Sequence, residues 1–153
     1  MRTPKEVRQV LYSKSPFVGF YYNMDNTFVL YRIQGTVEQG SAQARRSGYP
    51  TANLALLELP DIPEGIYCAW TAIDEEVKRI PSVVFYGIPH SLPRAVEPRF
   101  EVHLFEQNRD LYGKTLNVEL CVFIRENKKF EDFESLQEAI QDDIKKAKEY
   151  FNF

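Results

Sequence analysis

A short polar segment in the first half of the chain has the residue types of a magnesium–nucleotide site. The run is Pro50-Thr51-Ala52-Asn53, in which the proline fixes the backbone and an extended chain places the hydroxyl of Thr51 and the amide of Asn53 on one side. Both groups supply hard, neutral oxygen atoms. Mg²⁺ prefers such oxygens, keeps several waters and takes its other ligands from substrate phosphates. The pair therefore predicts a site for a magnesium–nucleotide complex.

The residues just before this pair are small or basic. Gly40, Arg45, Arg46 and Gly48 lie within residues 38–64, a long stretch without the periodicity of a helix or strand. Such loops in compact domains are usually functional, because small residues let backbone N–H groups approach an anion and arginine adds positive charge. On composition alone, a surface loop with an incidental arginine pair is the simpler explanation of the segment.

The elements that must position these residues are mostly strands. Within residues 100–105, Phe100, Val102 and Leu104 alternate with Glu101 and His103, so the last two share one face of a predicted strand. Successive strands joined by short polar turns favour an antiparallel meander or Greek key over β-α-β units, which need crossover helices. The strands are predicted at residues 28–37, 65–73, 80–86, 100–105 and 116–124, with an extra one around 17–22.

Two amphipathic patterns predict helices. A short one is predicted over residues 4–11, where Thr3 and Glu6 form a capping box and Pro4 occupies the first helical position. A longer one is predicted over residues 133–151, with Asp132 or Ser135 as its N-cap and an apolar stripe of Phe133, Leu136, Ile140, Ile144, Ala147 and Phe151. We therefore divide the chain into an N-terminal extension or linker, residues 1–27, and a mainly β domain, residues 28–153: a small antiparallel barrel with a C-terminal helix packed on it.

The composition excludes several classes of protein. The chain has 153 residues, a net charge of −3 and 14% aromatic residues, which is one globular domain with no general attraction for nucleic acid or anionic membranes. The aromatic content alone would suit a barrel that binds single-stranded nucleic acid, but the acidic balance argues against it. Cys68 and Cys121 lie inside apolar runs, so we expect free buried thiols in a reducing compartment. The chain is thus predicted to be cytoplasmic.

An ordered set of motifs resembles that of riboflavin kinase (flavokinase) domains. The resemblance covers roughly residues 31–148 and implies a six-stranded antiparallel Greek-key β-barrel with a C-terminal helix. The matching pieces are residues 35–40 (GTVEQG), Arg45, 48–53 (GYPTAN), 63–67 (PEGIY), 100–104 (FEVHL), 110–114 (DLYGK), 124–130 and 136–143.

The resemblance implies a reaction and roles for individual residues. The γ-phosphoryl group of ATP would pass to the 5′-hydroxyl of riboflavin, giving FMN and ADP, with Mg²⁺ bound by Thr51 and Asn53. Glu101 would be the general base that takes the hydroxyl proton. Contacts to the nucleotide and the flavin would come from Gly40, Arg45, Gly48, Pro50, Thr51, Asn53, Leu111, Tyr112 and Arg125.

Structural roles remain open for several of these residues. Glu101 would also suit a solvated strand face, and Leu111 with Tyr112 would suit an ordinary turn. Arg125 would equally form a surface salt bridge. His103, two residues from Glu101, either tunes the site or makes a structural hydrogen bond.

The chain departs from the family pattern at two places. Residues 40–45 read GSAQAR, with Ala42 and Ala44 where the family has glycine, and alanine costs roughly 1 kcal/mol or more wherever φ must be positive. Residues 85–90, FYGIPH, differ from the sequence that usually lines the flavin pocket. The alternative function is therefore a flavin- or nucleotide-binding module with weak or no kinase activity.

Many bacterial members of the family follow a domain that makes FAD. The sequence of this chain has no match to the nucleotide-binding signature of that adenylyltransferase domain. We therefore expect either a stand-alone kinase or a module once fused to such a domain.

Overall fold

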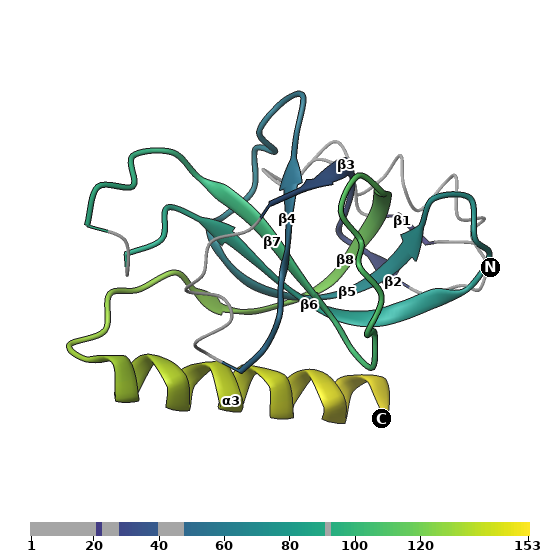
Figure 1. Cartoon of the computed structure of the whole chain (residues 1–153). Coiled ribbons are helices and arrows are strands. Elements are labelled where there is room, and N and C mark those ends of the chain that lie inside the picture. Colours follow the sequence, from purple (N-terminus) through teal and green to yellow (C-terminus); the bar gives the residue numbers. More distant parts are fainter. Residues whose placement is uncertain (1–20, 23–27, 40–47, 91–92) are drawn as a thin grey trace.

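The computed structural model describes residues 21–22, 28–39, 48–90 and 93–153 (Figure 1). The helix predicted over residues 4–11 lies outside the described residues, and so do Gly40 and Arg45. Of the extra strand predicted around residues 17–22, the described part is β1 (Tyr21–Tyr22), which pairs with β2 (Phe28–Val29).

Six strands close into an antiparallel barrel, as predicted. In chain order they are β3 (Tyr31–Glu38), β4 (Ala52–Ala55), β5 (Gly65–Ile73), β6 (Arg79–Gly87), β7 (Arg99–Leu104) and β8 (Thr115–Glu126). Around the barrel the order is β3-β4-β7-β6-β5-β8, and β8 closes on β3. Because β7 lies between β4 and β6, the strands β4 and β7, which are far apart in the sequence, become direct neighbours.

Two strands differ from the sequence-based prediction. The strand predicted over residues 28–37 is divided by a bend at Leu30, since β2 pairs with β1 whereas β3 pairs with β8 and β4. β4 was not predicted as a strand from its pattern. It has only four residues, and Ala52, Asn53 and Leu54 are all buried, so it lacks the alternation that identifies a half-exposed strand.

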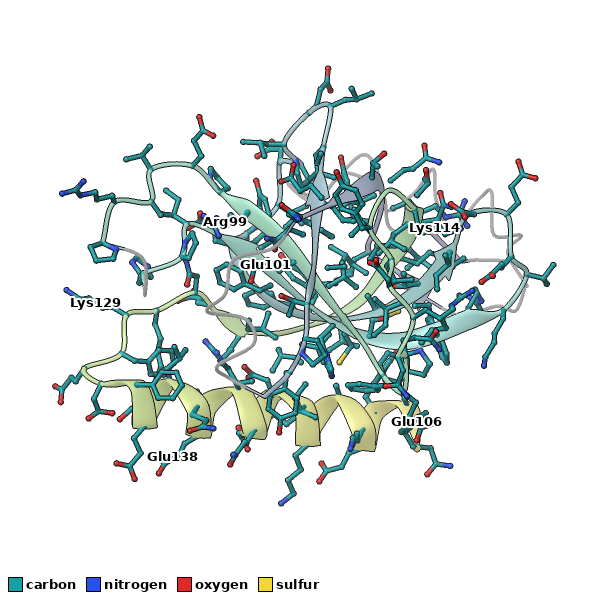
Figure 2. The ribbon with its side chains drawn as sticks, in the orientation of Figure 1. Arg99, Glu101, Glu106, Lys114, Lys129 and Glu138 are labelled. Atoms are coloured by element: carbon teal, nitrogen blue, oxygen red, sulfur yellow. The ribbon has the colours of Figure 1, made fainter. Side chains whose placement is uncertain are left out.

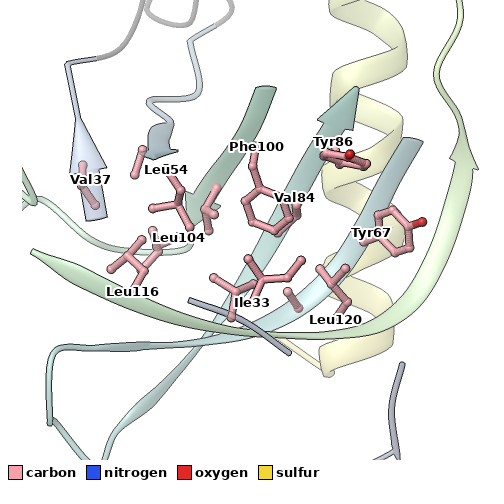
Figure 3. Packing of buried hydrophobic residues seen from close by; sticks show 14 of the residues in the cluster. Ile33, Val37, Leu54, Tyr67, Val84, Tyr86, Phe100, Leu104, Leu116 and Leu120 are labelled. Carbon is pink, nitrogen blue, oxygen red and sulfur yellow. The ribbon is translucent and has the colours of Figure 1, made fainter. Parts of the chain in front are cut away.

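Alternate residues of the strands fill the barrel interior (Figure 3). Tyr67 and Tyr86 carry polar hydroxyl groups into this core, and each donates a hydrogen bond to a backbone carbonyl of the β4–β5 connection: Pro63 at 2.6 Å and Pro60 at 3.1 Å. Burial raises the pKa of Tyr67 to about 12. The two rings therefore close the core at this end without leaving a polar atom unpaired.

The predicted C-terminal helix is α3 (Phe133–Phe151), which lies along the outside of the barrel (Figure 1). Asp132 is its N-cap and accepts a hydrogen bond from the backbone N–H of Ser135 at 2.7 Å. Ile144 and Ala147 on its buried face pack against residues of β5 and β6 that point out of the barrel: Ile66, Cys68 and Val83. Cys68 and Cys121 are buried and free, as predicted. Among the described residues, no helix combines the length and the apolar character that crossing a membrane requires.

Gly65 at the start of β5 sets how closely β8 can approach. A Cβ atom at this position would lie 2.6 Å from Cε2 of Phe123 and would overlap the carbonyl oxygen of Arg125. The backbone of β8 cannot yield there without disturbing its pairing with β5. Glycine at this position therefore permits the strand pairing that leads into Arg125.

We expect Gly65→Ala to lower the free energy of unfolding by about 2 kcal/mol, because the added methyl group meets backbone rather than a flexible side chain. Urea denaturation followed by circular dichroism measures this change. Gly113→Ala is the matched control: Gly113 has φ +79° with open space around it, so only the conformational cost of about 1 kcal/mol applies. Equal effects of the two substitutions would contradict the steric role of Gly65.

Candidate active site

The pairing of β4 with β7 places Asn53 directly opposite Glu101. Residues directly opposite in an antiparallel pair project to the same face. Ala52 and Leu54 of β4 and Val102 of β7 belong to the barrel core, so Asn53 and Glu101 both face outward. The structure thus brings together the predicted metal ligand and the predicted base.

Thr51 and Asn53 present two buried oxygen atoms that have no hydrogen-bond partner among the described residues. These oxygens are Oγ1 of Thr51 and Oδ1 of Asn53. On β5, Nε1 of Trp70 and Oγ1 of Thr71 are also buried without a hydrogen-bond partner among the described residues. A buried polar atom without a partner is costly, so two such oxygens only two residues apart indicate a ligand. Hard, neutral oxygens are donors that Mg²⁺ accepts, and the pair therefore fits the predicted metal.

A pocket of about 440 Å³ opens beside these residues, between the outer face of the barrel and the N-terminal half of α3. Its size lies within the usual range for small-molecule sites. Part of its wall is apolar, and charged groups stand at several points around it. The residues that line the pocket include Thr51, Ile66, Val83, Phe85, Glu101, His103, Arg125, Lys128, Phe130, Leu136, Ile140 and Asp143.

Glu101 is half-buried in the pocket wall, with Asn53 as its neighbour on β4 and Phe85 as its neighbour on β6. Burial raises the pKa of its carboxyl group, and the positive charge of Arg99 lowers the pKa by a smaller amount. Arg99 and Glu101 occupy alternate positions of β7 (Figure 2). A carboxylate with a raised pKa holds a proton more firmly than an exposed one, so Glu101 is suited to accept a proton from a hydroxyl group.

Arg125 forms an ion pair with Asp143 that joins the end of β8 to α3. Its guanidinium group donates three hydrogen bonds to the carboxylate at 2.8, 2.9 and 3.1 Å, and it lies over the ring of Phe130 at 5.4 Å. The side chain of Asp143 is only 3% exposed and that of Arg125 is 21% exposed. Of the two roles considered for Arg125, the structure shows the ion pair, and it also places the guanidinium group on the pocket wall.

Sequence reasoning had not given Asp143 a role. Burial raises the pKa of its carboxyl group, although Arg125 acts in the opposite direction. The available signal was its position three residues after Ile140, on the apolar side of the predicted helix. A charged residue on that side needs a partner from another element, here Arg125.

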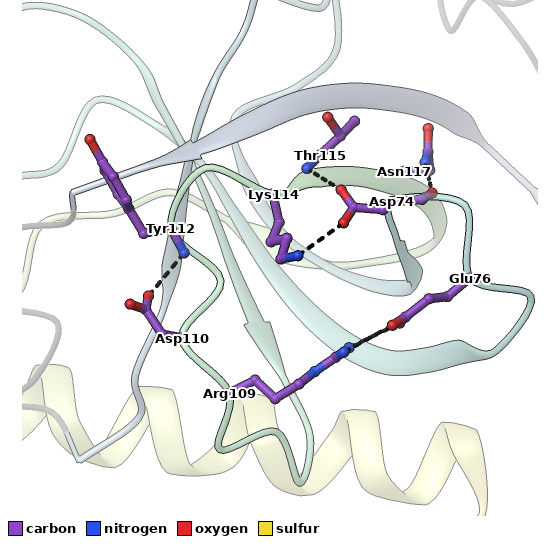
Figure 4. Close-up of polar contacts among 8 residues, drawn as sticks. All are labelled: Asp74, Glu76, Arg109, Asp110, Tyr112, Lys114, Thr115 and Asn117. Atoms are coloured by element: carbon purple, nitrogen blue, oxygen red, sulfur yellow. Dashed lines mark hydrogen bonds and ion pairs between the residues drawn. The ribbon is translucent and has the colours of Figure 1, made fainter.

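Leu111 and Tyr112 lie outside the pocket that contains Glu101. Leu111 packs against the barrel core, while Tyr112 is 65% exposed, and neither lines the pocket described above. Their turn is held at the β5–β6 connection (Figure 4): Lys114 pairs with Asp74 at 3.4 Å, and two hydrogen bonds of 2.9 Å join Arg109 to Glu76. The structure does not bring these two residues to Glu101, and contact with the nucleotide stays a prediction for them.

The remaining candidates precede β4. Gly48 is exposed and has φ +78°, a left-handed conformation that suits glycine. Pro50 is exposed, and its carbonyl oxygen accepts a hydrogen bond from Nδ1 of His103 at 2.8 Å. Thr51 and His103 line the same pocket as Glu101.

Sequence comparisons with known proteins indicate the riboflavin kinase family. A sequence model of the flavokinase family, described as riboflavin kinase, matches residues 28–151. The riboflavin kinase of Homo sapiens is 33% identical over 125 residues, which cover 77% of this chain and 79% of the relative. A bifunctional riboflavin kinase/FMN adenylyltransferase of Haemophilus influenzae is 32% identical over 126 residues, covering 80% of this chain but only 39% of that protein.

A solved structure supports the fold. The crystal structure of riboflavin kinase from Trypanosoma brucei matches with a TM-score of 0.59 and 19% identity, covering 79% of each chain. At this identity the likeness shows the architecture alone. The chain spans about two fifths of the length of the bifunctional relative.

We expect Asp143→Ala to lower the free energy of unfolding by about 3 kcal/mol, because it leaves the Arg125 guanidinium group partly buried without its partner. Urea denaturation measures the loss. Asp142→Ala removes the neighbouring surface pair with Lys146 (2.9 Å), in which both side chains are more than half exposed, and should cost less than about 1 kcal/mol. If the two variants are equally stable, the ion pair does not hold α3 to the barrel.

Proposed function

Because the chain belongs to the riboflavin kinase family, we propose that it transfers the γ-phosphoryl group of ATP to the 5′-hydroxyl of riboflavin, giving FMN and ADP. One observation carries the proposal: the register of β4 and β7 sets the predicted metal ligand Asn53 opposite the predicted base Glu101, beside a pocket that also contains Thr51. Phosphoryl transfer depends on positioning and charge neutralisation, and this arrangement provides groups for both.

Thr51 and Asn53 would hold Mg²⁺ through their unpartnered oxygens. When bound, the metal neutralises charge on the phosphates and aligns the γ-phosphoryl group. Glu101 would accept the proton of the 5′-hydroxyl as this oxygen attacks phosphorus, and its partly buried position favours the protonated product of that step.

The pocket would receive the flavin. Ile66, Val83 and Phe85 supply an apolar wall on the strands, and Leu136 and Ile140 face it from α3. A planar, mostly apolar ring system suits such a wall. The positive charge of Lys128 would favour the ribityl end once it carries a phosphate, and Arg125, whose charge is balanced by Asp143, would contribute hydrogen-bond donors.

The domain boundaries belong to the same proposal. Residues 28–153 would form the kinase domain and residues 1–27 an extension or linker, since the family match begins at residue 28. The bifunctional relatives combine two activities in a longer chain, so fusion to an adenylyltransferase domain is compatible with this domain.

Glu101→Gln should reduce the rate of FMN formation by a factor on the order of 10² to 10⁴, because the amide cannot accept the hydroxyl proton. FMN is measured by chromatography with riboflavin, ATP and Mg²⁺. The melting temperature should not fall, since a desolvated carboxylate is replaced by a neutral group of the same shape. Glu138→Gln, on the exposed face of α3, is the control and should retain wild-type rates.

Two outcomes would contradict the proposal. Turnover of Glu101→Gln at the wild-type rate would exclude Glu101 as the base. Binding of riboflavin by the wild type without formation of FMN would support the binding module suggested by Ala42 and Ala44.

The pH dependence of kcat/KM should show an acid limb set by Glu101. Its pKa is raised, so the carboxyl group stays protonated to a higher pH than an exposed glutamate, and activity rises as the pH increases through that pKa. Arg99→Gln removes the charge that lowers this pKa, so the limb should move to higher pH. A limb that stays in place in this variant would show that another group controls it.

A further inference from the structure

We propose that His103 is a positioning residue whose ring holds the segment carrying Thr51 and Asn53 at a fixed place beside Glu101. The proposal rests on the proposed function, since it assigns a purpose to the metal-binding pair and the base. Nδ1 of His103 lies 2.8 Å from the carbonyl oxygen of Pro50, directly before Thr51. The strand of the base thereby contacts the segment of the metal ligands at a second point.

The need for this contact follows from the short pairing of β4 with β7. Only Ala52 with Val102 and Asn53 with Glu101 are paired between these strands. Pro50 lacks a backbone N–H group and cannot extend the ladder toward the N-terminus. β7 continues to His103, which pairs with Val83 of β6 on its other side. The side chain of His103 therefore replaces the missing backbone contact.

The partner fixes which nitrogen carries the proton. A carbonyl oxygen only accepts hydrogen bonds, so Nδ1 of His103 must be the donor. Burial lowers the pKa of the ring; the hydrogen bond to Pro50 acts in the opposite direction with a smaller effect, and the nearby charge of Lys148 lowers the pKa further. In the neutral ring the proton is on Nδ1 and the lone pair on Nε2.

Aromatic neighbours hold the ring in this orientation. The rings of Tyr49 and Phe105 each make an edge-to-face contact with the imidazole, with a distance of 5.5 Å between ring centroids. Tyr49 belongs to the same segment as Pro50, so packing and the hydrogen bond act on adjacent residues. Thr51 is thus held between the His103 contact and the first pair of the ladder, Ala52 with Val102.

Loss of the hydrogen bond should loosen Thr51 relative to Glu101 while leaving the flavin wall in place. Two variants separate the parts of the side chain: His103→Phe keeps a ring between Tyr49 and Phe105 but has no donor, whereas His103→Asn keeps a donor near the position of Nδ1 but loses the ring. The first should bind Mg²⁺–ADP about tenfold more weakly in calorimetry and show a similar rise in KM for ATP. Because His103 also lines the pocket, riboflavin affinity is measured alongside, and it should fall by less than the affinity for Mg²⁺–ADP.

His103→Asn should recover most of the Mg²⁺–ADP affinity. If His103→Phe binds Mg²⁺–ADP as tightly as the wild type, or if His103→Asn is no better than His103→Phe, the positioning role is wrong. A wild type that does not bind Mg²⁺–ADP at all would contradict the proposed function itself. The two failures are therefore distinguishable.

Nitrogen-15 NMR tests the proposal without altering His103. The chain has two histidines, so His90→Gln leaves His103 as its one imidazole. We expect a neutral ring with a protonated Nδ1 and an unprotonated Nε2 near neutral pH. A ring protonated on Nε2 alone would overturn the proposal, even if the His103 variants failed to fold.

Discussion

The antiparallel pairing of β4 with β7 is the contact on which the candidate site depends. It is short, but both of its faces are used: Ala52, Leu54 and Val102 pack into the barrel, while Asn53 and Glu101 face outward. A slip of one residue would reverse every side chain of β4 and bring the Asn53 amide into the core. The apolar packing inside the barrel therefore fixes the register of the polar groups outside it.

The C-terminal helix turns this outer face into a pocket. Ile144 and Ala147 of α3 pack against β5 and β6 at one end, and the Arg125–Asp143 pair joins the helix to β8. The N-terminal half of the helix leaves a space of about 440 Å³ against the barrel. Glu101 is partly buried in the wall of this space, and this burial raises the pKa of the proposed base.

Regular patterns predicted most of the fold. The apolar stripe over residues 133–151 correctly predicted α3. The alternation of apolar and polar residues over 100–105 correctly predicted which residues of β7 enter the core and that Glu101 and His103 do not. β4 could not be recognised from its pattern, because it is buried on both faces and shows no alternation. The bend at Leu30 could not be predicted either, since it depends on which strands pair there. The family motifs identified Thr51, Asn53 and Glu101 as candidates. The sequence could not show that Asn53 lies opposite Glu101, because this depends on the pairing of β4 with β7, nor that Arg125 pairs with Asp143, because this depends on how α3 packs on the barrel.

A crystal structure of the protein with Mg²⁺, ADP and riboflavin would test the central claim most directly. The account predicts that the metal binds Oγ1 of Thr51 and Oδ1 of Asn53, the two buried oxygens without a partner among the described residues. It also predicts the flavin in the pocket under α3, with its 5′-hydroxyl within hydrogen-bond distance of Glu101. A metal held by other residues, or a flavin bound away from Glu101, would contradict it.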